Sequence, residues 1–258
     1  MDREGGVDRP PWQIPAALAE VLRTAGHVAV LTGAGISAES GVPTFRDAQT
    51  GLWARYRPQD LATREAFQRH PRLVWEWYAW RRALVAQAAP NPGHRALVEL
   101  EQRVPKLTLL TQNVDGLHQR AGSRRVIELH GNLARTRCFE EDSVVDAWEE
   151  TGEVPPRCPR CGSLLRPDVV WFGEALPPQA LQAAREAAST CDLFLAVGTS
   201  GIVEPAASLP YAALRSGAVV VEINPEATPL TADVPYALHG PAGVVLPALL
   251  QAAWPDSG

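Results

Sequence analysis

The chain has 258 residues, of which 46% are hydrophobic, and a formal net charge of −5 at pH 7. This length is sufficient for one large domain, or for one domain with an inserted module. No run of 18 apolar residues occurs, which argues against a membrane-spanning helix, and the negative charge argues against nucleic acid as the main partner. Residues 1–11 are polar and lack the apolar segment of a secretory signal, so we expect a cytoplasmic protein. Lys106 is the only lysine among the 24 basic residues.

Short apolar runs, rich in β-branched residues, predict the buried strands of a parallel sheet. The first run is 27–31, which ends in a glycine-rich turn, and the others are 107–111, 126–129, 193–197 and 219–223. A helix is predicted over 205–215, between the last two runs, and another over 246–254. This alternation indicates an α/β fold with a Rossmann-like, doubly wound parallel sheet.

Two segments interrupt the alternation and are expected to be inserts. Residues 48–105 contain helical patterns but no convincing strand, and one helix, around 73–85, is rich in tryptophan. Residues 134–167 contain three of the four cysteines and are expected to form a small zinc-ribbon-like module. The nucleotide-binding core would then comprise residues 12–47, 106–133 and 168–258.

A glycine-rich turn, Gly33-Ala34-Gly35, follows the first predicted strand. Glycine lets backbone N–H groups approach a pyrophosphate closely, although an ordinary tight turn uses glycine in the same way. Ser37-Ala38 stands where the third glycine of a dinucleotide-binding G-x-G-x-x-G would fall, and no acidic residue ends a second strand at the usual distance. These departures argue against an ordinary dehydrogenase.

Polar side chains follow the later predicted strands, at the edge where open α/β sheets bind ligands. Gln112, Asn113 and Asp115 follow strand 107–111, but such residues are also common turn formers. His130 follows strand 126–129 and could act as a general base, or it could be a hydrogen-bonded core residue. Gly198-Thr199-Ser200 follows strand 193–197. The hydroxyl groups of Thr199 and Ser200 could bind phosphate or ribose, or cap a helix.

Five separated blocks, read together, resemble a single family. They are GAGISAESGVPTFRD at 33–47, TQNVDGLH at 111–118, ELHGN at 128–132, VVWFGE at 169–174 and GTS at 198–200. In this order they resemble the sirtuins, which are NAD-dependent protein lysine deacylases, from about Val28 to the C-terminus. The resemblance implies a dinucleotide site that cleaves NAD at its nicotinamide end.

The resemblance also implies roles for individual residues. His130 would be the general base, and Asn113 would assist it from the nicotinamide pocket. The implied NAD contacts are Gly33, Ala34, Gly35, Ser37, Phe45, Arg46, Gln112, Asn113, Asp115, Gly198, Thr199, Ser200, Asn224 and Ala242. The segment 170–174 is similar to the sirtuin strand that pairs with the backbone of a substrate peptide, which implies substrate contacts at Val170, Phe172, Gly173 and Glu174.

The tryptophan-rich helix carries a more specific hypothesis about the substrate. Tyr78 and Arg81 are spaced i, i+3 and therefore share one helix face. An arginine binds a carboxylate through two parallel N–H donors, although such a pair can also be a solvated arginine beside a core aromatic residue. The sequence WEWYAWRR (75–82) resembles the Tyr-x-x-Arg helix of the class III sirtuins, which remove succinyl, malonyl and glutaryl groups.

The cysteines depart from the family pattern, because sirtuins commonly hold a structural zinc ion with two Cys-x-x-Cys hooks. The second hook is present at Cys158 and Cys161, but the first retains only Cys138, with Glu141 at its other position. Three thiolates with Glu141 or water could still bind zinc, since carboxylates are accepted ligands. Alternatively, the metal is lost and packing alone holds the loop.

The predicted activity is NAD-dependent removal of acyl groups from protein lysines, with nicotinamide and O-acyl-ADP-ribose as products. Acetyl groups, and also succinyl or malonyl groups, are the expected acyl substrates. The alternatives are a plain deacetylase in which Tyr78 and Arg81 are incidental, a protein ADP-ribosyltransferase, and an NAD-sensing module without catalysis. His130 and Asn113 argue against the last of these. The oligomeric state stays open.

Overall fold

The computed structural model describes residues 13–43 and 56–255, and its centre is a six-stranded sheet. The strand order is β3-β2-β1-β6-β7-β8, and every pair of neighbours is parallel. The strands are β1 (His27–Thr32), β2 (Lys106–Thr111), β3 (Val126–Glu128), β6 (Leu193–Val197), β7 (Val219–Asn224) and β8 (Tyr236–His239). The predicted doubly wound parallel sheet is therefore confirmed, and β8 is an additional strand.

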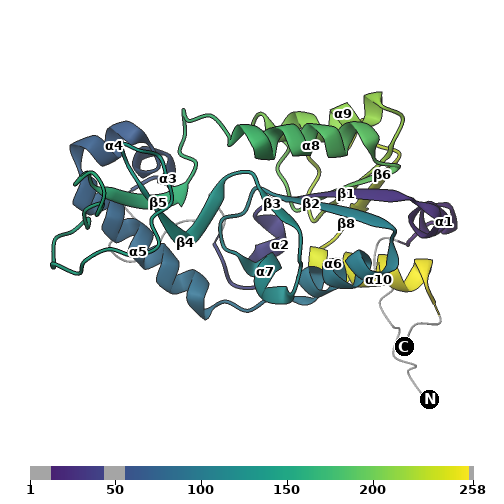
Figure 1. Ribbon diagram of the computed structural model, residues 1–258. Coiled ribbons are helices and arrows are strands. Elements are labelled where there is room, and N and C mark those ends of the chain that lie inside the picture. The colour runs from purple at the N-terminus through teal and green to yellow at the C-terminus, as the bar shows by residue number, and fades with distance from the viewer. Residues whose placement is uncertain (1–12, 44–55, 256–258) are drawn as a thin grey trace, which may run out of the picture.

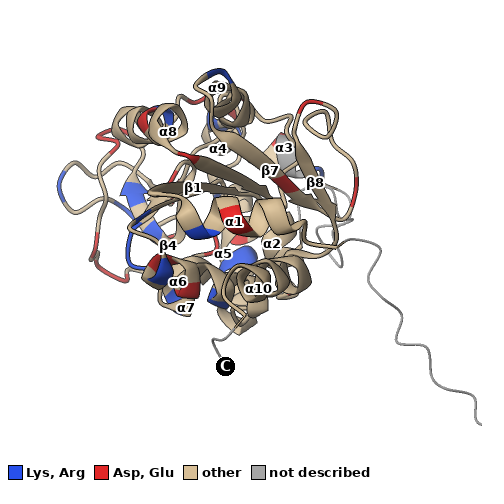
Figure 2. Cartoon of the chain, turned by 90° about the vertical axis from the view of Figure 1, so that its right-hand side faces the viewer, with Lys and Arg blue, Asp and Glu red and all other residues tan. Residues whose placement is uncertain are grey.

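Helices cover both faces of this sheet (Figure 1), and Figure 2 shows the same three layers from the end of the molecule. One face carries α8 (Pro178–Thr190), the 3-10 helix η2 (Ala206–Ser208) and α9 (Leu209–Arg215). The other carries α1 (Ala16–Thr24), α6 (Pro92–Arg103) and α10 (Ala242–Ala253). Because both faces are covered, β1 is buried along its whole length and its sequence does not alternate between apolar and polar residues.

A smaller module lies beyond the carboxyl ends of the strands (Figure 1). It contains α3 (Pro58–Leu61), α4 (Arg64–Arg69), α5 (Pro71–Gln87) and an antiparallel pair, β4 (Gly131–Cys138) and β5 (Leu165–Val169). These elements share an apolar cluster of their own, which includes Phe67, Trp77, Leu133 and Trp171. Two short helices follow strands of the sheet: α2 (Gly35–Ala38) comes after β1, and α7 (Leu117–Ala121) connects β2 to β3.

Helix α6 packs with the sheet and not with the smaller module. Its residues Leu97 and Leu100 are buried in the same apolar cluster as Val28 of β1 and Leu246 of α10. The side chain of Asn91 caps the helix by accepting hydrogen bonds from the amides of Gly93 and His94. We propose that the helical insert, expected over 48–105, ends before this cap, so that α6 belongs to the nucleotide-binding core.

Within the described residues, no helix is both long enough and apolar enough to cross a membrane.

Candidate functional site

The carboxyl ends of β1, β2 and β6 lie side by side, because the register pairs Thr32 with both Thr111 and Val197. The residues that follow these strands therefore meet at one edge of the sheet. The order of strands reverses between β1 and β6, which is where open α/β sheets bind their ligands. The polar residues expected to form the site come from the loops at this point.

Three glycines bring two of these loops into backbone contact. The amide of Gly33 donates to the carbonyl of Val197 at 3.0 Å, and the amide of Gly35 donates to the carbonyl of Gly198 at 2.8 Å. A Cβ atom added to Gly35 would lie 2.7 Å from the Cα of Gly198, and one added to Gly198 would lie 2.5 Å from the nitrogen of Ile36. No larger residue fits at these positions. The loops therefore form a surface made of backbone, of the kind that a pyrophosphate can approach closely.

Asn113, Ser37 and Asp115 form a hydrogen-bonded group beside the glycines. The Asn113 amide donates to the carbonyl of Gly33 at 3.0 Å and to the Ser37 hydroxyl at 3.1 Å, and that hydroxyl donates to Asp115 at 2.7 Å. Burial raises the pKa of Asp115, while hydrogen bonds from the Leu117 amide and Ser37 and the charge of Arg81 oppose the increase. These contacts fix the orientation of the Asn113 side chain.

The other predicted cofactor residues lie on the β6 and β7 side of the same edge. Thr199 joins two of them, because its hydroxyl accepts from Gln112 at 2.9 Å and its carbonyl accepts from Asn224 at 2.8 Å. Ser200 follows and is half-buried. Ala242 is buried at the first turn of α10, close to Gly93, so packing alone explains its burial and its ligand contact stays a prediction.

Phe45 and Arg46, expected on the cofactor loop, lie outside the described residues.

His130 lies between β3 and β4 in an orientation suited to a general base. Its Nδ1 atom lies 2.9 Å from the carbonyl oxygen of Gln112. A carbonyl can only accept, so Nδ1 carries the proton and Nε2 is left unprotonated in the neutral ring. Burial lowers the pKa of His130, and the hydrogen bond to Gln112 only partly offsets this effect. The ring is therefore neutral at pH 7, with a proton acceptor at Nε2.

A cavity of about 150 Å³ extends from His130 into the smaller module. A cavity of that size can accommodate a group as large as a benzene ring. Its lining comprises Ala62, Tyr78, Arg81, Gln112, Val114, His130, Val169, Val170, Trp171, Phe172, Gly173, Glu174, Leu176, Val203 and Glu204. The cavity therefore brings together the predicted base, the predicted substrate segment and the pair on α5.

Tyr78 and Arg81 are close to one another on this lining, as their spacing on a helix predicts. The guanidinium carbon of Arg81 lies 5.8 Å from the ring centroid of Tyr78 and 5.0 Å from that of Trp77. Burial raises the pKa of Tyr78 to about 12, so the residue is a neutral phenol at pH 7. Burial also lowers the pKa of Arg81, but a guanidinium stays charged at pH 7. The cavity thus contains one cation and one hydroxyl donor.

The segment 170–174 is not the regular strand that the sequence predicted, because β5 ends at Val169. The amides of Val170, Phe172 and Glu174 donate to carbonyls of the chain itself, those of His130, Ala62 and Trp171. These three amides are therefore already bonded, and a substrate peptide could pair only with other backbone groups of the segment. The Glu174 side chain is directed at Arg166, a buried residue that the sequence analysis did not single out. Glu174 also lines the cavity, so its expected substrate contact stays a prediction while its side chain forms an internal ion pair.

The three predicted cysteine ligands lie together with Glu141. The ligand atoms of Cys138, Glu141, Cys158 and Cys161 all lie within 4.8 Å of one another, which is compatible with four ligands around one metal ion. The Cys138 and Cys161 sulfur atoms are 3.4 Å apart. Glu141 also forms an ion pair with Arg160 at 2.9 Å, so its carboxylate is shared between the cluster and that arginine.

Known proteins resemble this chain over almost its full length. The Sir2 family model matches residues 33–205. An NAD-dependent protein deacylase from Ralstonia nicotianae is 56% identical over 92% of this chain and 96% of its own length. NAD-dependent protein deacylase 1 from Pseudomonas aeruginosa is 53% identical over 93% of this chain and 99% of its own length.

Solved structures agree with the sequence comparison. A Sir2 homologue in complex with NAD superposes with a TM-score of 0.86 at 45% identity, covering 95% of this chain and 96% of that one. A Sir2 complex with a p53 peptide and NAD+ gives a TM-score of 0.81 at 33% identity, covering 91% and 96%. The sequence resemblance is thereby confirmed, and the chain belongs to the Sir2 family.

Proposed function

We propose that this protein is an NAD-dependent protein-lysine deacylase that accepts acidic acyl groups as well as acetyl. The observation that carries the proposal is the cavity that His130 shares with Tyr78 and Arg81. The relatives described as NAD-dependent protein deacylases support the general activity. The acidic acyl preference is supported by the side chains of this chain alone.

The residues at the edge of the sheet fit NAD as a co-substrate. The backbone surface at Gly33, Gly35 and Gly198 would approach its pyrophosphate, since no Cβ atom intervenes. When bound, NAD supplies a ribose carbon from which nicotinamide can leave, so that the acyl oxygen of the modified lysine can take its place. Asn113 and Asp115, held by Ser37, would line the position of the nicotinamide.

His130 would accept a proton from a ribose hydroxyl at its Nε2 atom. The Gln112 carbonyl keeps the proton on Nδ1 and thus directs Nε2 as the acceptor. Because burial lowers its pKa, the ring would not lose this role through protonation at neutral pH. Deprotonation would let this hydroxyl attack the acyl carbon. Lysine would then leave as the free amine, and one water molecule would be consumed, so that the acyl group stays on the ribose as an ester.

Arg81 and Tyr78 would select the acyl group at the far end of the cavity. A terminal carboxylate would accept hydrogen bonds from the guanidinium and the phenol, and the opposite charges would be partly shielded from water. An acetyl group is shorter and makes neither contact. The pair would therefore favour succinyl or malonyl groups through binding, without a part in bond cleavage.

Zinc, if bound, would have a structural role, because four protein ligands leave no open coordination position for a substrate. Cys138, Cys158, Cys161 and Glu141 would hold it. The metal would join the end of β4 to the turn at Cys158 and Cys161, within the connection that leads to β5. A cytoplasmic location and the exclusion of nucleic acid as a partner stay predictions.

Mass spectrometry of acyl-lysine peptides incubated with NAD tests the proposal. One sequence should be prepared in acetyl, succinyl, malonyl, glutaryl and fatty acyl forms. We expect free lysine, nicotinamide and O-acyl-ADP-ribose, with faster turnover of an acidic acyl form than of the acetyl form. Turnover of acetyl alone would reduce the function to a plain deacetylase. ADP-ribose attached to the peptide would indicate a transferase, and no turnover of any form would refute the proposal.

A further inference from the structure

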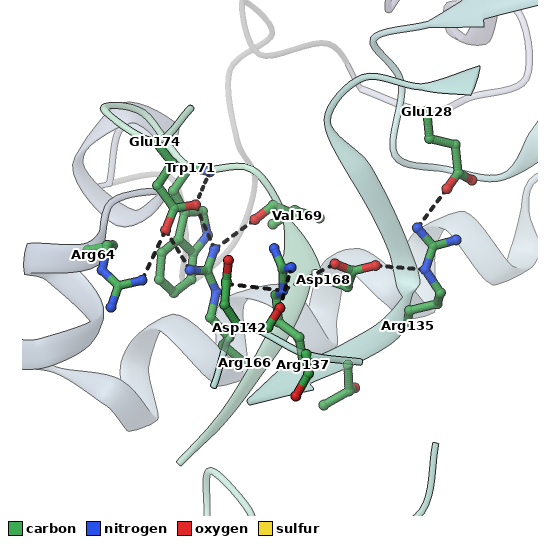
Figure 3. A network of polar contacts seen from close by, with 12 residues as sticks. Arg64, Glu128, Arg135, Arg137, Asp142, Arg166, Asp168, Val169, Trp171 and Glu174 are labelled. Atoms are coloured by element: carbon green, nitrogen blue, oxygen red, sulfur yellow. Dashed lines mark hydrogen bonds and ion pairs between the residues drawn. The ribbon is translucent and has the colours of Figure 1, made fainter. Parts of the chain in front are cut away.

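A buried ion pair lies at the wall of the cavity, where one partner, Glu174, is part of the lining. The Arg166 side chain is 0% exposed and binds Glu174 through two hydrogen bonds, from Nη1 to Oε1 at 2.6 Å and from Nη2 to Oε2 at 2.9 Å. Nη2 also donates to the carbonyl of Val169 at 2.7 Å. Figure 3 shows this cluster, with Arg64 on the outer side of Glu174 at 3.5 Å. The two charges are therefore held in one fixed geometry.

A buried pair of this kind is an expensive way to stabilise a fold, because both charges lose their hydration. Burial would raise the pKa of Glu174, but hydrogen bonds from Arg166 and the Trp171 amide, together with the charges of Arg166 and Arg64, outweigh burial and lower it. Glu174 is thus ionised at neutral pH. Apolar residues of similar size could fill the same volume, so stability alone does not account for this pair. A role in positioning a neighbouring residue does.

The pair positions Trp171 from two sides. The guanidinium carbon of Arg166 lies 3.4 Å from the centroid of the Trp171 ring, and the Trp171 amide donates to Glu174 Oε2 at 2.8 Å. The indole is 1% exposed and also contacts Phe67, with 5.4 Å between ring centroids. Its backbone and its ring plane are therefore both fixed by Arg166 and Glu174.

Trp171 in turn contacts Tyr78, the residue proposed with Arg81 to select the acyl group. Its indole Nε1–H donates to the hydroxyl oxygen of Tyr78 at 2.9 Å, across 93 residues of sequence. Once the phenol oxygen accepts this bond, its own proton must point away from the indole. Tyr78, Arg81 and Trp171 all line the cavity, so a proton that points away from the indole is available to a group bound beside Arg81.

We propose that Trp171 is a specificity-determining positioning residue, which the Arg166–Glu174 pair holds in place so that the Tyr78 hydroxyl donates toward the carboxylate of an acidic acyl group. This inference rests on the proposed function. It adds that acyl choice depends on a residue that touches no substrate carboxylate. It also explains why the Glu174 side chain turns inward.

The test is Trp171→Phe, which keeps an aromatic ring but removes the N–H donor together with part of the ring volume at that position. We expect KM for a succinyl-lysine peptide to rise about five- to tenfold, the worth of one neutral hydrogen bond, with kcat nearly unchanged. KM for the acetyl-lysine peptide and for NAD should stay within about twofold of wild type. That change is smaller than the loss of one hydrogen bond would cause. Trp254→Phe, the same substitution at the end of α10, is the matched control and should change none of these constants.

A double-mutant cycle with Tyr78→Phe separates positioning from general damage to the core. If Trp171 acts through the Tyr78 hydroxyl, the double variant should be no worse for succinyl-lysine than Tyr78→Phe alone. Arg166→Lys, which keeps the charge but loses the two-pronged geometry, should reproduce the effect of Trp171→Phe. Additive losses in the double variant, or equal losses on succinyl and acetyl peptides, would overturn the inference.

The wild-type acyl profile distinguishes failure of this inference from failure of the proposed function. A wild-type enzyme that removes succinyl groups, combined with an unaltered Trp171→Phe variant, would refute the inference alone. A wild-type enzyme that removes acetyl groups and gains nothing from a carboxylate would refute the acidic acyl preference, and the role of Trp171 with it.

Discussion

Replacing Arg81 with methionine removes the one cation on the cavity lining while keeping a long, flexible side chain at that position. In the free protein, this charge acts on Asp115 and Tyr78, among the residues that the structure describes. It opposes the pKa increase that burial imposes on Asp115, and it lies 5.8 Å from the ring of Tyr78. The substitution should therefore affect every substrate through Asp115 and acidic substrates additionally through the lost carboxylate contact.

The size of the second effect follows from the setting of Arg81. Removing one partner of a buried ion pair costs about 3 to 5 kcal/mol. Arg81 is half-buried, so the lower limit applies. At 1.36 kcal/mol for each factor of ten, a loss of about 3 kcal/mol lowers kcat/KM for a succinyl peptide about 100-fold. The effect through Asp115 is common to both acyl groups and cancels in the ratio of their kcat/KM values.

The assay is kcat/KM for one peptide sequence bearing either succinyl-lysine or acetyl-lysine, at saturating NAD. The ratio of the two constants should fall about 100-fold in Arg81→Met, mostly through KM. Arg82→Met is the matched control on the same helix, because Arg82 donates to the carbonyl of Leu133 at 2.6 Å and supports the fold. Arg82→Met should lower stability and leave the ratio unchanged. Equal loss of both activities in Arg81→Met would show that Arg81 only supports the structure.

Four further outcomes follow from the site and its surroundings. His130→Ala should retain NAD binding by calorimetry but lose turnover about 100- to 10,000-fold, and turnover near that of wild type would contradict its role as the base. Because burial lowers the pKa of His130 from its ordinary value of 6.5, the acid limb of the kcat/KM profile should lie below pH 6.5, and a limb above that pH would argue against this ring. Elemental analysis should find about one zinc ion per chain, as expected for a four-ligand structural site, and less in Cys158→Ser; metal-poor protein whose Tm ignores chelators would show that packing alone holds the loop. Desolvation and the neighbouring charge of Arg95 lower the pKa of His94 to about 4. Desolvation and neighbouring His94 lower the pKa of His118 to about 3. The folded state therefore resists protonation of both rings, whereas the unfolded state accepts these protons below pH 6.5. Stability should therefore be unaffected by these rings above pH 6.5 and fall by about 2 kcal/mol for each at pH 5. Urea unfolding of wild type and His94→Asn at pH 7 and pH 5 measures this, and an identical pH dependence in the two proteins would refute it.

The sheet could be predicted because its strands carry their own signal. The run Leu193–Val197 is apolar throughout, and the structure places β6 at the same residues. β8, Tyr236–His239, has only four residues and two of them are half-buried, so neither length nor periodicity distinguishes it from a loop. α10 begins at Ala242, earlier than predicted, because Pro241 serves as its N-cap without any side-chain hydrogen bond that sequence could reveal.

The sequence likewise predicts some features of the site and not others. The positions of Gln112 and His130 follow from strand ends, which the sequence predicts. The orientation of Glu174 does not, because it depends on Arg166, whose complete burial arises only when β5 packs against α4 and α5. The bond between Trp171 and Tyr78 joins residues 93 positions apart, and no local pattern indicates it.

The single lysine has a practical consequence for experiments on this molecule. Lys106 is exposed at the first residue of β2, while the polar cluster follows the last, so the two are separated by about 16 Å of extended strand. Among lysine side chains, an amine-directed fluorophore can attach only there, on the edge of the sheet opposite the cavity. A protein that acts on acylated lysines would thus carry one lysine of its own, distant from its catalytic centre. Labelling at Lys106 would report peptide binding by energy transfer without obstructing entry to the site.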